Sequence, residues 1–331
     1  MLGGQFMKRR EFIALLAGVA SSVSAHAQVR QRPARIGWLA PLSPAAAAPT
    51  ISGLRSGLRE LGWVENTDYL IEFRFADGVS DRLPTLASEL VAQNVDLIVT
   101  GSTPGALAAK RATSTIPIVF VTTGAPVADG IITSLGRPGG NLTGVTTLGV
   151  ELAPKRLQLL KELLPGLKRV ATLGNPRSLY ADEFRSSIDK ISTAIGVELL
   201  HIDVQQSQEL SAAFDKAVAA RADAILVQSE VLFITQRSLI IALAAKARLP
   251  MMVPDREFVT DGGLMFYGAS LSSMYRHAAI LADKVLKGAK PADIPVEQPT
   301  RFELIISLKT AKSLGIELPA SILVRADEVI E

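Results

Sequence analysis

Cysteine is absent from the chain, and aromatic residues are scarce, at 5%. The lack of cysteine excludes disulfide bridges, thiolate metal sites and a lipid anchor on a cysteine. Aspartate and glutamate are scattered along the chain, so no close carboxylate pattern for a hard cation is visible. We therefore expect neither a metal nor a cofactor.

The local motifs of common enzyme classes are also absent. The chain has no G-x-S-x-G elbow, no G-x-x-x-x-G-K-S/T phosphate loop and no G-x-G-x-x-G fingerprint. Beyond the N-terminal segment only His201 and His277 remain, one in an expected strand and the other in an expected helix. This placement does not indicate a shared metal or acid–base role, and we expect a protein that is not an enzyme.

Long hydrophobic runs are missing after residue 28, and the apolar run Ala14–Val23 is shorter than the roughly 20 residues of a spanning helix. This run follows Lys8-Arg9-Arg10-Glu11-Phe12 and precedes Ala25-His26-Ala27. A basic start, a short apolar core and an A-x-A exit are typical of an export signal with a cleavage site. We therefore expect residues 1–27 to be cleaved after Ala27 and the mature protein to be periplasmic.

The route and the start of this segment each have an alternative. The Arg9-Arg10-x-Phe12 arrangement indicates the twin-arginine route. Lys8 stands where that signal more often has Ser or Thr, which leaves the general secretory route as the alternative. Met7 is an alternative start to Met1, and a basic tail before a core helix is the alternative to an export signal.

The charge balance excludes one class of partner. The chain has 35 Lys and Arg against 32 Asp and Glu, a net charge of +3, and two of these positive charges belong to the export signal. No basic block follows, so nothing indicates nucleic-acid binding. At 48% hydrophobic residues the chain is globular and not disordered.

Short apolar runs alternate with longer segments of helical period, which predicts an α/β protein with parallel sheets covered by helices. The expected strands are Arg35–Leu39, Tyr69–Phe75, Asp96–Thr100, Pro117–Val121, Arg169–Leu173, Val197–Asp203, Asp223–Val227, Met251–Val253 and Gly263–Tyr267, with Phe302–Ile306 in the tail. The expected helices include Ile51–Leu61, Leu83–Gln93, Pro104–Ala112, Pro154–Leu164, Ala181–Ile195, Leu210–Ala220, Phe233–Ala247, Ser272–Leu286 and Lys309–Leu314.

An internal repeat indicates two similar lobes. Asp96-Leu-Ile-Val-Thr-Gly-Ser102 resembles Asp223-Ala-Ile-Leu-Val-Gln-Ser229, and each precedes a helix that contains Ala-Leu-Ala-Ala-Lys. Each helix leads to an Ile/Leu-Pro pair before the next strand. The alternative is a chance resemblance between two alanine-rich helices.

The join between the lobes is expected near Pro138–Gly144, where three glycines and a proline allow dihedrals that other residues resist. An ordinary surface turn is the alternative. Further crossings are expected after Gly268 and around Pro295–Pro299. The first lobe then comprises residues 33–145 plus 269–295, and the second 146–268 plus 296–331.

Small hydroxyl residues follow several strands, where ligands bind in open α/β sheets. Thr100-Gly-Ser-Thr-Pro104 opens a helix whose free N–H groups can hold a carboxylate, unless the cap serves only its own helix. An acid in the second lobe can meet a ligand ammonium. The expected ligand-binding residues are Ser43, Ser102, Thr103 and Thr123 in the first lobe and Asn175, Ser178, Ser229 and Asp255 in the second.

The chain resembles the extracytoplasmic substrate-binding proteins of ABC importers, in the branch that includes tryptophan-type binders, over essentially its whole length. The run Arg137-Pro-Gly-Gly-Asn-Leu-Thr-Gly-Val145 is the most specific part of this resemblance. The other matching segments are Lys8–Ile13, Ile36–Leu39, Gly62–Asn66, Asp81–Pro84 and Ile116–Phe120.

The resemblance implies a type I periplasmic binding fold, with two lobes joined by a three-segment hinge and closing on a ligand. It implies a monomeric, non-catalytic receptor that delivers a small amino-acid-like or aromatic solute to a membrane permease with its ATPase subunit. Ala125 departs from the family, which often has Gly-Asp-Pro-Val where this chain has Gly124-Ala-Pro-Val127. A sensory protein for a membrane kinase and an exported α/β enzyme are the alternatives.

Overall fold

The computed structural model describes residues 32–122 and 124–331. The expected export signal, residues 1–27, lies outside the described residues, and so does Thr123. Within the described part of the chain, no helix has the length and apolar character needed to cross a membrane.

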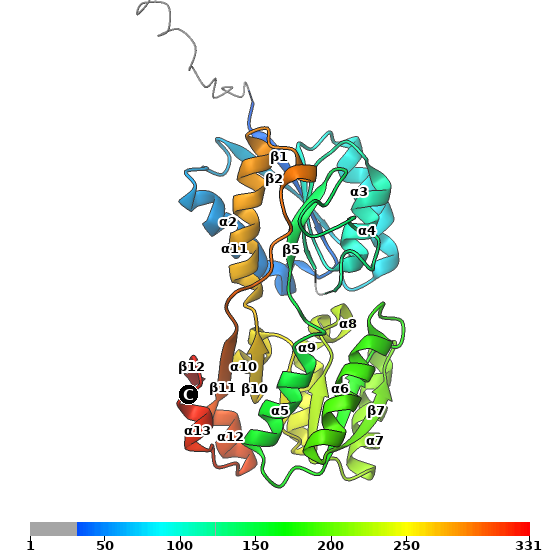
Figure 1. Cartoon of the computed structure of the whole chain (residues 1–331), viewed down its shortest axis with the longest axis vertical. Coiled ribbons are helices and arrows are strands. Elements are labelled where there is room, and N and C mark those ends of the chain that lie inside the picture. The colour runs from blue at the N-terminus through cyan, green and yellow to red at the C-terminus, as the bar shows by residue number, and fades with distance from the viewer. Residues whose placement is uncertain (1–31, 123) are drawn as a thin grey trace, which may run out of the picture. The chain divides into compact units, whose positions relative to one another are not determined.

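The first sheet has five parallel strands in the order β2-β1-β3-β4-β5. We call this sheet with its covering helices the first lobe (Figure 1). Its strands are β1 (Ala34–Ala40), β2 (Tyr69–Phe75), β3 (Leu97–Gly101), β4 (Ile118–Thr122) and β5 (Leu142–Thr146). Its helices are α2 (Pro44–Glu60), α3 (Leu83–Ala92), α4 (Thr103–Ala112) and α11 (Leu271–Leu286), with the short turns η1 (Ser80–Arg82) and η3 (Pro291–Asp293).

The second sheet has seven strands in the order β12-β11-β10-β9-β8-β6-β7, and with its helices it forms the second lobe. All its pairs are parallel except β10 with β11, so this sheet is mixed. Its strands are β6 (Arg169–Gly174), β7 (Glu198–Asp203), β8 (Ala224–Val227), β9 (Met251–Val253), β10 (Met265–Gly268), β11 (Glu303–Ser307) and β12 (Glu328–Ile330). Its helices are α5 (Ala153–Leu163), α6 (Ala181–Ile195), α7 (Leu210–Ala219), α8 (Val231–Thr235), α9 (Arg237–Ala247), α10 (Arg256–Thr260), α12 (Leu308–Leu314) and α13 (Ala320–Leu323), with the turn η2 (Ser207–Glu209).

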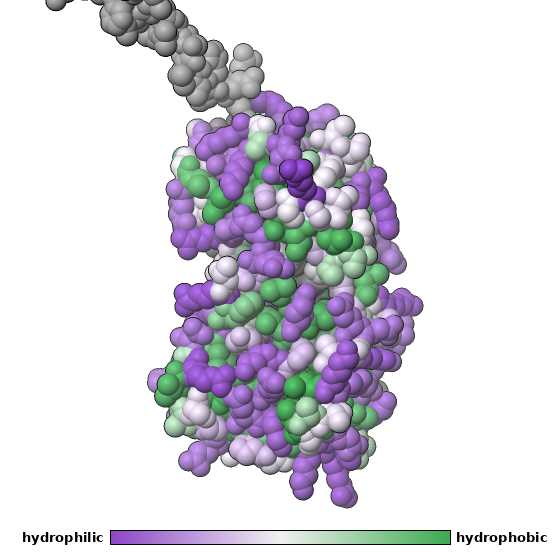
Figure 2. All heavy atoms as spheres, in the orientation of Figure 1, coloured by the Kyte–Doolittle hydropathy of each residue, from purple (hydrophilic) through white to green (hydrophobic). Residues whose placement is uncertain are grey.

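Each sheet separates two hydrophobic cores. In the first lobe Val99 packs into the core on one face of β3, and Ile98 packs into the core on the other. In the second lobe Ile225 and Leu226 divide in the same way between the faces of β8. Buried parallel strands need apolar residues on both faces, which explains their continuous apolar runs. On the face seen in Figure 2, hydrophilic side chains cover most of the surface and hydrophobic ones form smaller groups.

The chain passes between the two sheets three times, after β5, after β10 and before β11. After β10 it returns to the first lobe as α11, which packs against α2 with backbones in close approach. A methyl group on Gly53 would lie 2.2 Å from the carbonyl oxygen of Ser272. The third passage runs beside the first, because the Thr146 N–H donates to the Glu297 oxygen at 2.9 Å.

The glycine-rich segment, near which the join between the lobes was expected, lies directly before the first passage. Its first residues form the turn before β5, its last residues belong to β5, an edge strand that was not among the expected strands, and the passage follows Thr146. Gly139 and Gly140 adopt φ values of 72° and 63°, which favour glycine. Gly144 lies in β5 against β4, where a methyl group would come within 2.2 Å of the Phe120 oxygen.

The sequence repeat occupies equivalent places in the two sheets. The Asp96 carboxylate accepts the Arg35 N–H at 2.7 Å and joins β3 to β1. The Asp223 carboxylate accepts the Arg169 N–H at 2.8 Å and joins β8 to β6. Each aspartate therefore fixes the start of a central strand to its neighbour, and Ser102 and Ser229 follow the far ends of these strands.

Candidate functional site

A cleft of about 600 Å³, part of it open to solvent, lies where the carboxyl ends of central strands in both sheets come together. Residues of β1, β3 and β4, of the segments after β1, β3 and β5, and of α2 and α11 line it from the first lobe. The loop after β8 and α8 line it from the second. In sheets of this kind ligands bind beyond the carboxyl ends of the strands. The cleft is therefore the candidate ligand site.

Aromatic and aliphatic side chains form the first-lobe wall of the cleft. Trp38 lies in β1 and Tyr275 in α11, and their ring centroids are 5.1 Å apart with the planes tilted by 35°. Pro41 and Leu42 extend this wall beyond the end of β1. Gly101 leaves room for the Tyr275 hydroxyl, since a methyl group there would lie 2.3 Å from that oxygen.

The second lobe contributes an acid. Ser229, Glu230, Val231 and Ile234 line the cleft from the loop after β8 and from α8. A Glu230 carboxylate oxygen accepts the N–H of Leu232 at 2.7 Å and so caps α8. Burial raises the pKa of Glu230, and the Leu232 N–H and the Asn175 side chain oppose this shift. The cleft therefore contains a carboxylate that burial destabilises in its charged form.

Some buried polar atoms that belong to cleft-lining residues have no hydrogen-bond partner within residues 32–122 and 124–331. They include the Trp38 indole nitrogen, Nε1, and the Thr147 hydroxyl oxygen, Oγ1. Burial alone raises the pKa of the Tyr275 hydroxyl above its usual range. Buried donors are nearly always hydrogen-bonded in folded proteins, so unsatisfied ones at a cleft mark positions where a ligand or water can bind.

Ser102 and Ser229, predicted from the repeat, both line the cleft. Ser102 caps α4 by accepting the Gly105 N–H at 3.3 Å. Its φ of 63° and ψ of 159° belong to a region that non-glycine residues rarely adopt, at a cost of about 1–3 kcal/mol. The Ser102 N–H donates to the Val121 oxygen at 2.9 Å, and this hydrogen bond stabilises the strained backbone conformation of Ser102. Residues in such conformations cluster at functional sites.

Thr103 joins the lobes at a second point. Its hydroxyl lies 2.5 Å from the hydroxyl of Tyr180, which comes from the second lobe, and 3.5 Å from an Asp129 carboxylate oxygen. Tyr180 in turn donates to Asp129. Gly124 packs against the Tyr180 ring, where a methyl group would lie 1.6 Å from the hydroxyl oxygen. We call Thr103, Asp129 and Tyr180 the interlobe cluster.

Burial governs the ionisation of the interlobe cluster. Burial raises the pKa of Asp129, against the hydrogen bonds from Tyr180 and Thr103, and raises the pKa of Tyr180 far above its usual range. The Asp129 N–H donates to the Ala125 oxygen at 3.0 Å. The carboxylate of the interlobe cluster therefore lies one turn beyond Ala125.

Among the described residues that were predicted, Ser43, Asp255, Asn175 and Ser178 are not in the lining of this cleft. Ser43 caps α2 through the Ala46 N–H, at 3.4 Å. Asp255 is buried and caps α10 through the Glu257 N–H at 3.0 Å, and burial raises its pKa well above the usual range. Thr123 lies outside the described residues.

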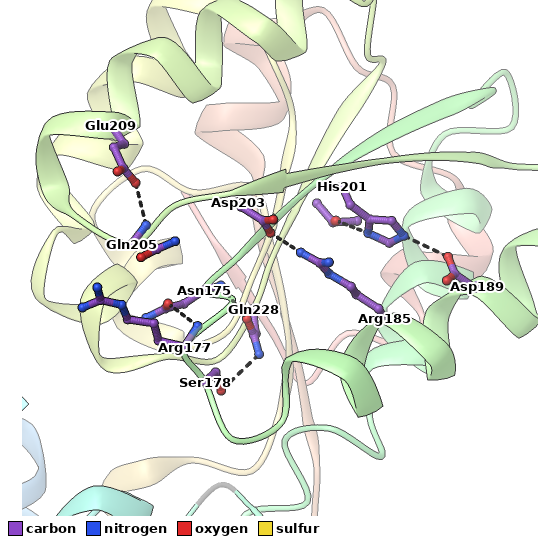
Figure 3. Close-up of polar contacts among 11 residues, drawn as sticks. Asn175, Arg177, Ser178, Arg185, Asp189, His201, Asp203, Gln205, Glu209 and Gln228 are labelled. Carbon is purple, nitrogen blue, oxygen red and sulfur yellow. Dashed lines mark hydrogen bonds and ion pairs between the residues drawn. The ribbon is translucent and has the colours of Figure 1, made fainter.

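Asn175 and Ser178 meet around Gln228 in the second lobe (Figure 3). Gln228 accepts the Asn175 N–H at 2.9 Å and donates to the Ser178 hydroxyl at 3.5 Å. Figure 3 also shows His201 facing Asp189, with Nε2 and Oδ1 3.0 Å apart. Gln228 thus joins the loops after β6 and β8, His201 and Asp189 join β7 to α6, and the Asn175 side chain also hydrogen-bonds the cleft-lining Glu230.

The expected carboxylate site at the start of α4 has few donors to offer. Pro104 has no N–H, the Gly105 N–H is bound by Ser102, and the Ala106 N–H donates to the Ser102 oxygen at 3.1 Å. The polar groups that line the cleft here are hydroxyls and not a row of free amides.

Trp38, Thr147, Glu230 and Tyr275 were absent from the predicted ligand-binding residues. Trp38 lies in a strand and packs in the core, with 2% of its surface exposed, which is the ordinary place for a tryptophan. Glu230 directly follows the repeated segment that ends at Ser229, so the repeat gave a signal for it. Thr147 and Tyr275 belong to segments around the passages between lobes, whose place at the cleft depends on the tertiary fold.

Comparisons with known proteins agree with this architecture. A family model described as "ABC transporter substrate binding protein" matches residues 35–330. The chain is similar to a tyrosine-binding protein from Clostridioides difficile, with 27% identity over 266 residues that cover 80% of this chain and 76% of that protein.

Two solved structures share the fold. The ABC domain from Streptococcus pneumonia in complex with L-Trp has a TM-score of 0.83 and 26% identity, and the match covers 90% of this chain and 100% of that one. A conserved domain protein from Vibrio cholerae has the same TM-score and the same coverage, with 25% identity. The fold is that of type I periplasmic binding proteins, with two α/β lobes joined by three segments.

Proposed function

Because the chain belongs to the family of ABC transporter substrate-binding proteins, we propose that it is the solute receptor of an ABC importer. It captures a small molecule between its lobes and delivers it to a membrane permease that works with a separate ATPase subunit. It acts by binding, without catalysis, and as a monomer. The lobes of this proposal are residues 33–145 plus 269–295 and residues 146–268 plus 296–331.

The cleft between the two sheets is the single observation that carries this proposal. Its lining comes from strand ends of both lobes, and three chain segments connect those lobes. Because only a small number of segments connect the lobes, the two lobes can open and close about a hinge as rigid bodies. A ligand that contacts both walls favours the closed form by its greater affinity for that form.

The ligand of this proposal is amino-acid-like or aromatic. The similarity to a tyrosine-binding protein and to an L-Trp complex supports this class. In this chain Trp38 and Tyr275 offer aromatic surface, and Ser102 and Ser229 offer hydroxyls from opposite lobes. Tight packing around an aromatic body with a few polar contacts is typical of small-molecule sites.

The proposed place of action is the periplasm. The family acts outside the cytoplasm, and the sequence of residues 1–27 has the pattern of an export signal cleaved after Ala27. N-terminal sequencing of protein recovered from the periplasm tests this part of the proposal. A mature N-terminus at Gln28 supports it, and recovery of the intact leader in the cytoplasm contradicts it.

A thermal-shift screen with amino acids, ureas, nucleosides, sugars and aromatic acids tests the receptor function. A ligand at about 100 times its dissociation constant adds roughly 2.7 kcal/mol to the folded state, a shift that such a screen detects. The double variant Ser102→Ala with Ser229→Ala should then weaken binding of the hit by about tenfold in calorimetry, because each lost hydrogen bond contributes about 0.5–1.5 kcal/mol.

Ser43→Ala is the matched control for this double variant. Ser43 also caps a helix in the first lobe but is not in the lining of the cleft. Its replacement by alanine should therefore lower the stability of the protein and leave its affinity for the ligand unchanged. Equal effects of the control and the double variant on affinity would move the site away from the cleft. A screen without any hit would contradict the receptor function.

A further inference from the structure

We propose that the cleft takes a ligand with two polar ends, a cationic nitrogen held by Glu230 and a hydrogen-bond acceptor held by the indole N–H of Trp38. This inference rests on the proposed receptor function and deepens it, because it names the chemistry that the site recognises. It assigns specificity to residues that the similarity to other proteins does not identify.

Glu230 is the acidic end of the site. Among the described residues that line the cleft it is the one ionisable carboxylate, and neither lysine nor arginine lines the cleft with it. None of the ion pairs among the described residues includes Glu230. The Leu232 N–H and the Asn175 side chain hydrogen-bond the carboxylate and fix the direction of the side chain. Since a carboxylate has about four lone-pair sites, acceptor capacity remains for a ligand.

A ligand cation would compensate the carboxylate. A buried carboxylate without a cation is unfavourable, and it gains most from an opposite charge that arrives with a ligand. The α8 cap holds Glu230 in place before the ligand binds, so that the ligand does not have to order this side chain. An ammonium or amidinium group fits such an acceptor, since it offers several N–H donors and a positive charge.

Trp38 is the donor end of the site. Its ring lies in the core with 2% of its surface exposed, and its Nε1 atom has no partner among the described residues. The tryptophan N–H can only donate, so its partner must be an acceptor such as a carbonyl or carboxylate oxygen. The unpartnered Thr147 hydroxyl offers a second hydrogen bond at the segment that follows β5.

The two ends lie on different lobes. Trp38 belongs to β1 of the first lobe, and Glu230 follows β8 of the second. Between them the rings of Trp38 and Tyr275 and the side chains of Val231 and Ile234 give an apolar surface for the body of the ligand. A molecule that satisfies both ends therefore bridges the lobes and favours closure.

The test uses matched probes that differ by one polar group. L-tryptophan and L-tryptophanamide carry an ammonium and an acceptor, tryptamine carries the ammonium alone, and indole-3-propionate carries the acceptor alone. L-leucine, 3-methylbutylamine and 4-methylpentanoate repeat the comparison with an aliphatic body. In calorimetry on the full mature protein we expect two-ended probes to bind best, amines about fivefold to tenfold more weakly, and acids without an ammonium not measurably.

Variants assign each end to its residue. Glu230→Gln keeps the shape and an acceptor oxygen for the α8 cap, and it should weaken binding of the two-ended probes by at least tenfold. Glu209→Gln is the matched control, because Glu209 also accepts backbone N–H groups as a cap, at Gln205, but lies outside the cleft. Trp38→Phe should abolish the affinity difference between L-tryptophanamide and tryptamine, a ratio that remains readable if the variant is less stable.

Two kinds of result overturn the assignment. One is tight binding by acids or neutral sugars with no binding by any ammonium probe, which would retain the receptor function but reject the cationic ligand. The other is unchanged affinity of the two-ended probes in Glu230→Gln. Absence of any ligand from the wider thermal-shift screen would instead reject the receptor function itself.

Discussion

Single buried residues hold the passages between the lobes, and Arg156 is the clearest case. It lies in α5, with 4% of its surface exposed, and its guanidinium donates to the Tyr267 oxygen at 2.7 Å and to the Gly149 oxygen at 3.4 Å. Gly149 belongs to the first passage and Tyr267 to the strand before the second. Burial lowers the pKa of Arg156 to about 10, against the attraction of Asp255, so the side chain stays charged at neutral pH.

Arg156→Lys should therefore destabilise the protein although it keeps the charge. An ammonium group cannot reproduce the planar fork that reaches two separate carbonyls, so at least one buried carbonyl loses its donor. We expect a loss of about 1–3 kcal/mol in the free energy of unfolding, measured by urea denaturation. Arg82→Lys, at an exposed pair with Asp77, is the control and should stay within about 0.5 kcal/mol. Equal stability of the two variants would show that the guanidinium geometry is unimportant.

The packing of α11 against α2 connects the second passage to the first lobe. α11 begins three residues after β10 ends and then packs along α2. Gly53 and Gly57 of α2 face the α11 backbone, and a methyl group on Gly57 would lie 2.4 Å from the Arg276 oxygen. The Trp63 indole donates to Asp283 at 2.8 Å and fixes the far end of the same contact. The small residues thus allow two helices to approach where larger side chains would separate them.

Gly57→Ala tests this close contact. Alanine favours a helix by about 1 kcal/mol over glycine, so an exposed site would become more stable. Here the added methyl meets backbone, and we expect a net loss of about 1–3 kcal/mol in unfolding free energy, seen as a lower melting temperature. Ser52→Ala on the exposed side of α2 is the matched control and should change stability by less than about 0.5 kcal/mol. A more stable Gly57→Ala protein would contradict the packing.

The fold as a whole could be predicted where local pattern decides it. β9 has the bounds expected from its apolar run, since Pro250 and Pro254 enclose Met251–Val253. β5 was missed because it is short, contains Gly144 and follows two other glycines. Its pairing with β4 on one side and its bridge to Glu297 on the other come from distant segments. Local sequence carries no signal for such partners.

The candidate site likewise has residues that the sequence could predict and residues that it could not. Ser102 and Ser229 could be predicted because the repeat places both after central strands, and the structure brings both to the cleft. Trp38 could not be recognised, since a tryptophan in a strand normally packs. Its distinguishing property is an N–H that has no partner in the part of the chain that the structure describes. At the start of α4 the sequence does not show that Ser102 accepts the N–H groups of Gly105 and Ala106, which leaves fewer donors for the expected carboxylate.

Closure of the whole molecule should depend on the interlobe cluster as well as on the ligand. Tyr180 of the second lobe bonds to Thr103 and Asp129 of the first, and these contacts can exist only while the lobes are together. Any contact made only in the closed form shifts the equilibrium toward that form by its own free energy. The interlobe cluster therefore reduces the binding free energy that a ligand must supply to close the cleft.

Tyr180→Phe should shift the free protein toward the open form without touching the cleft. Loss of a buried hydrogen bond to a carboxylate costs about 1.5–3 kcal/mol, so we expect about tenfold to hundredfold weaker binding of the ligand found by screening, mainly through faster release. Small-angle scattering should also give a larger radius of gyration for the free variant. Tyr267→Phe is the control, since its ring packs on Phe302 within the second lobe and should affect neither measurement. An unchanged radius of gyration together with unchanged affinity would show that the cluster does not contribute to closure.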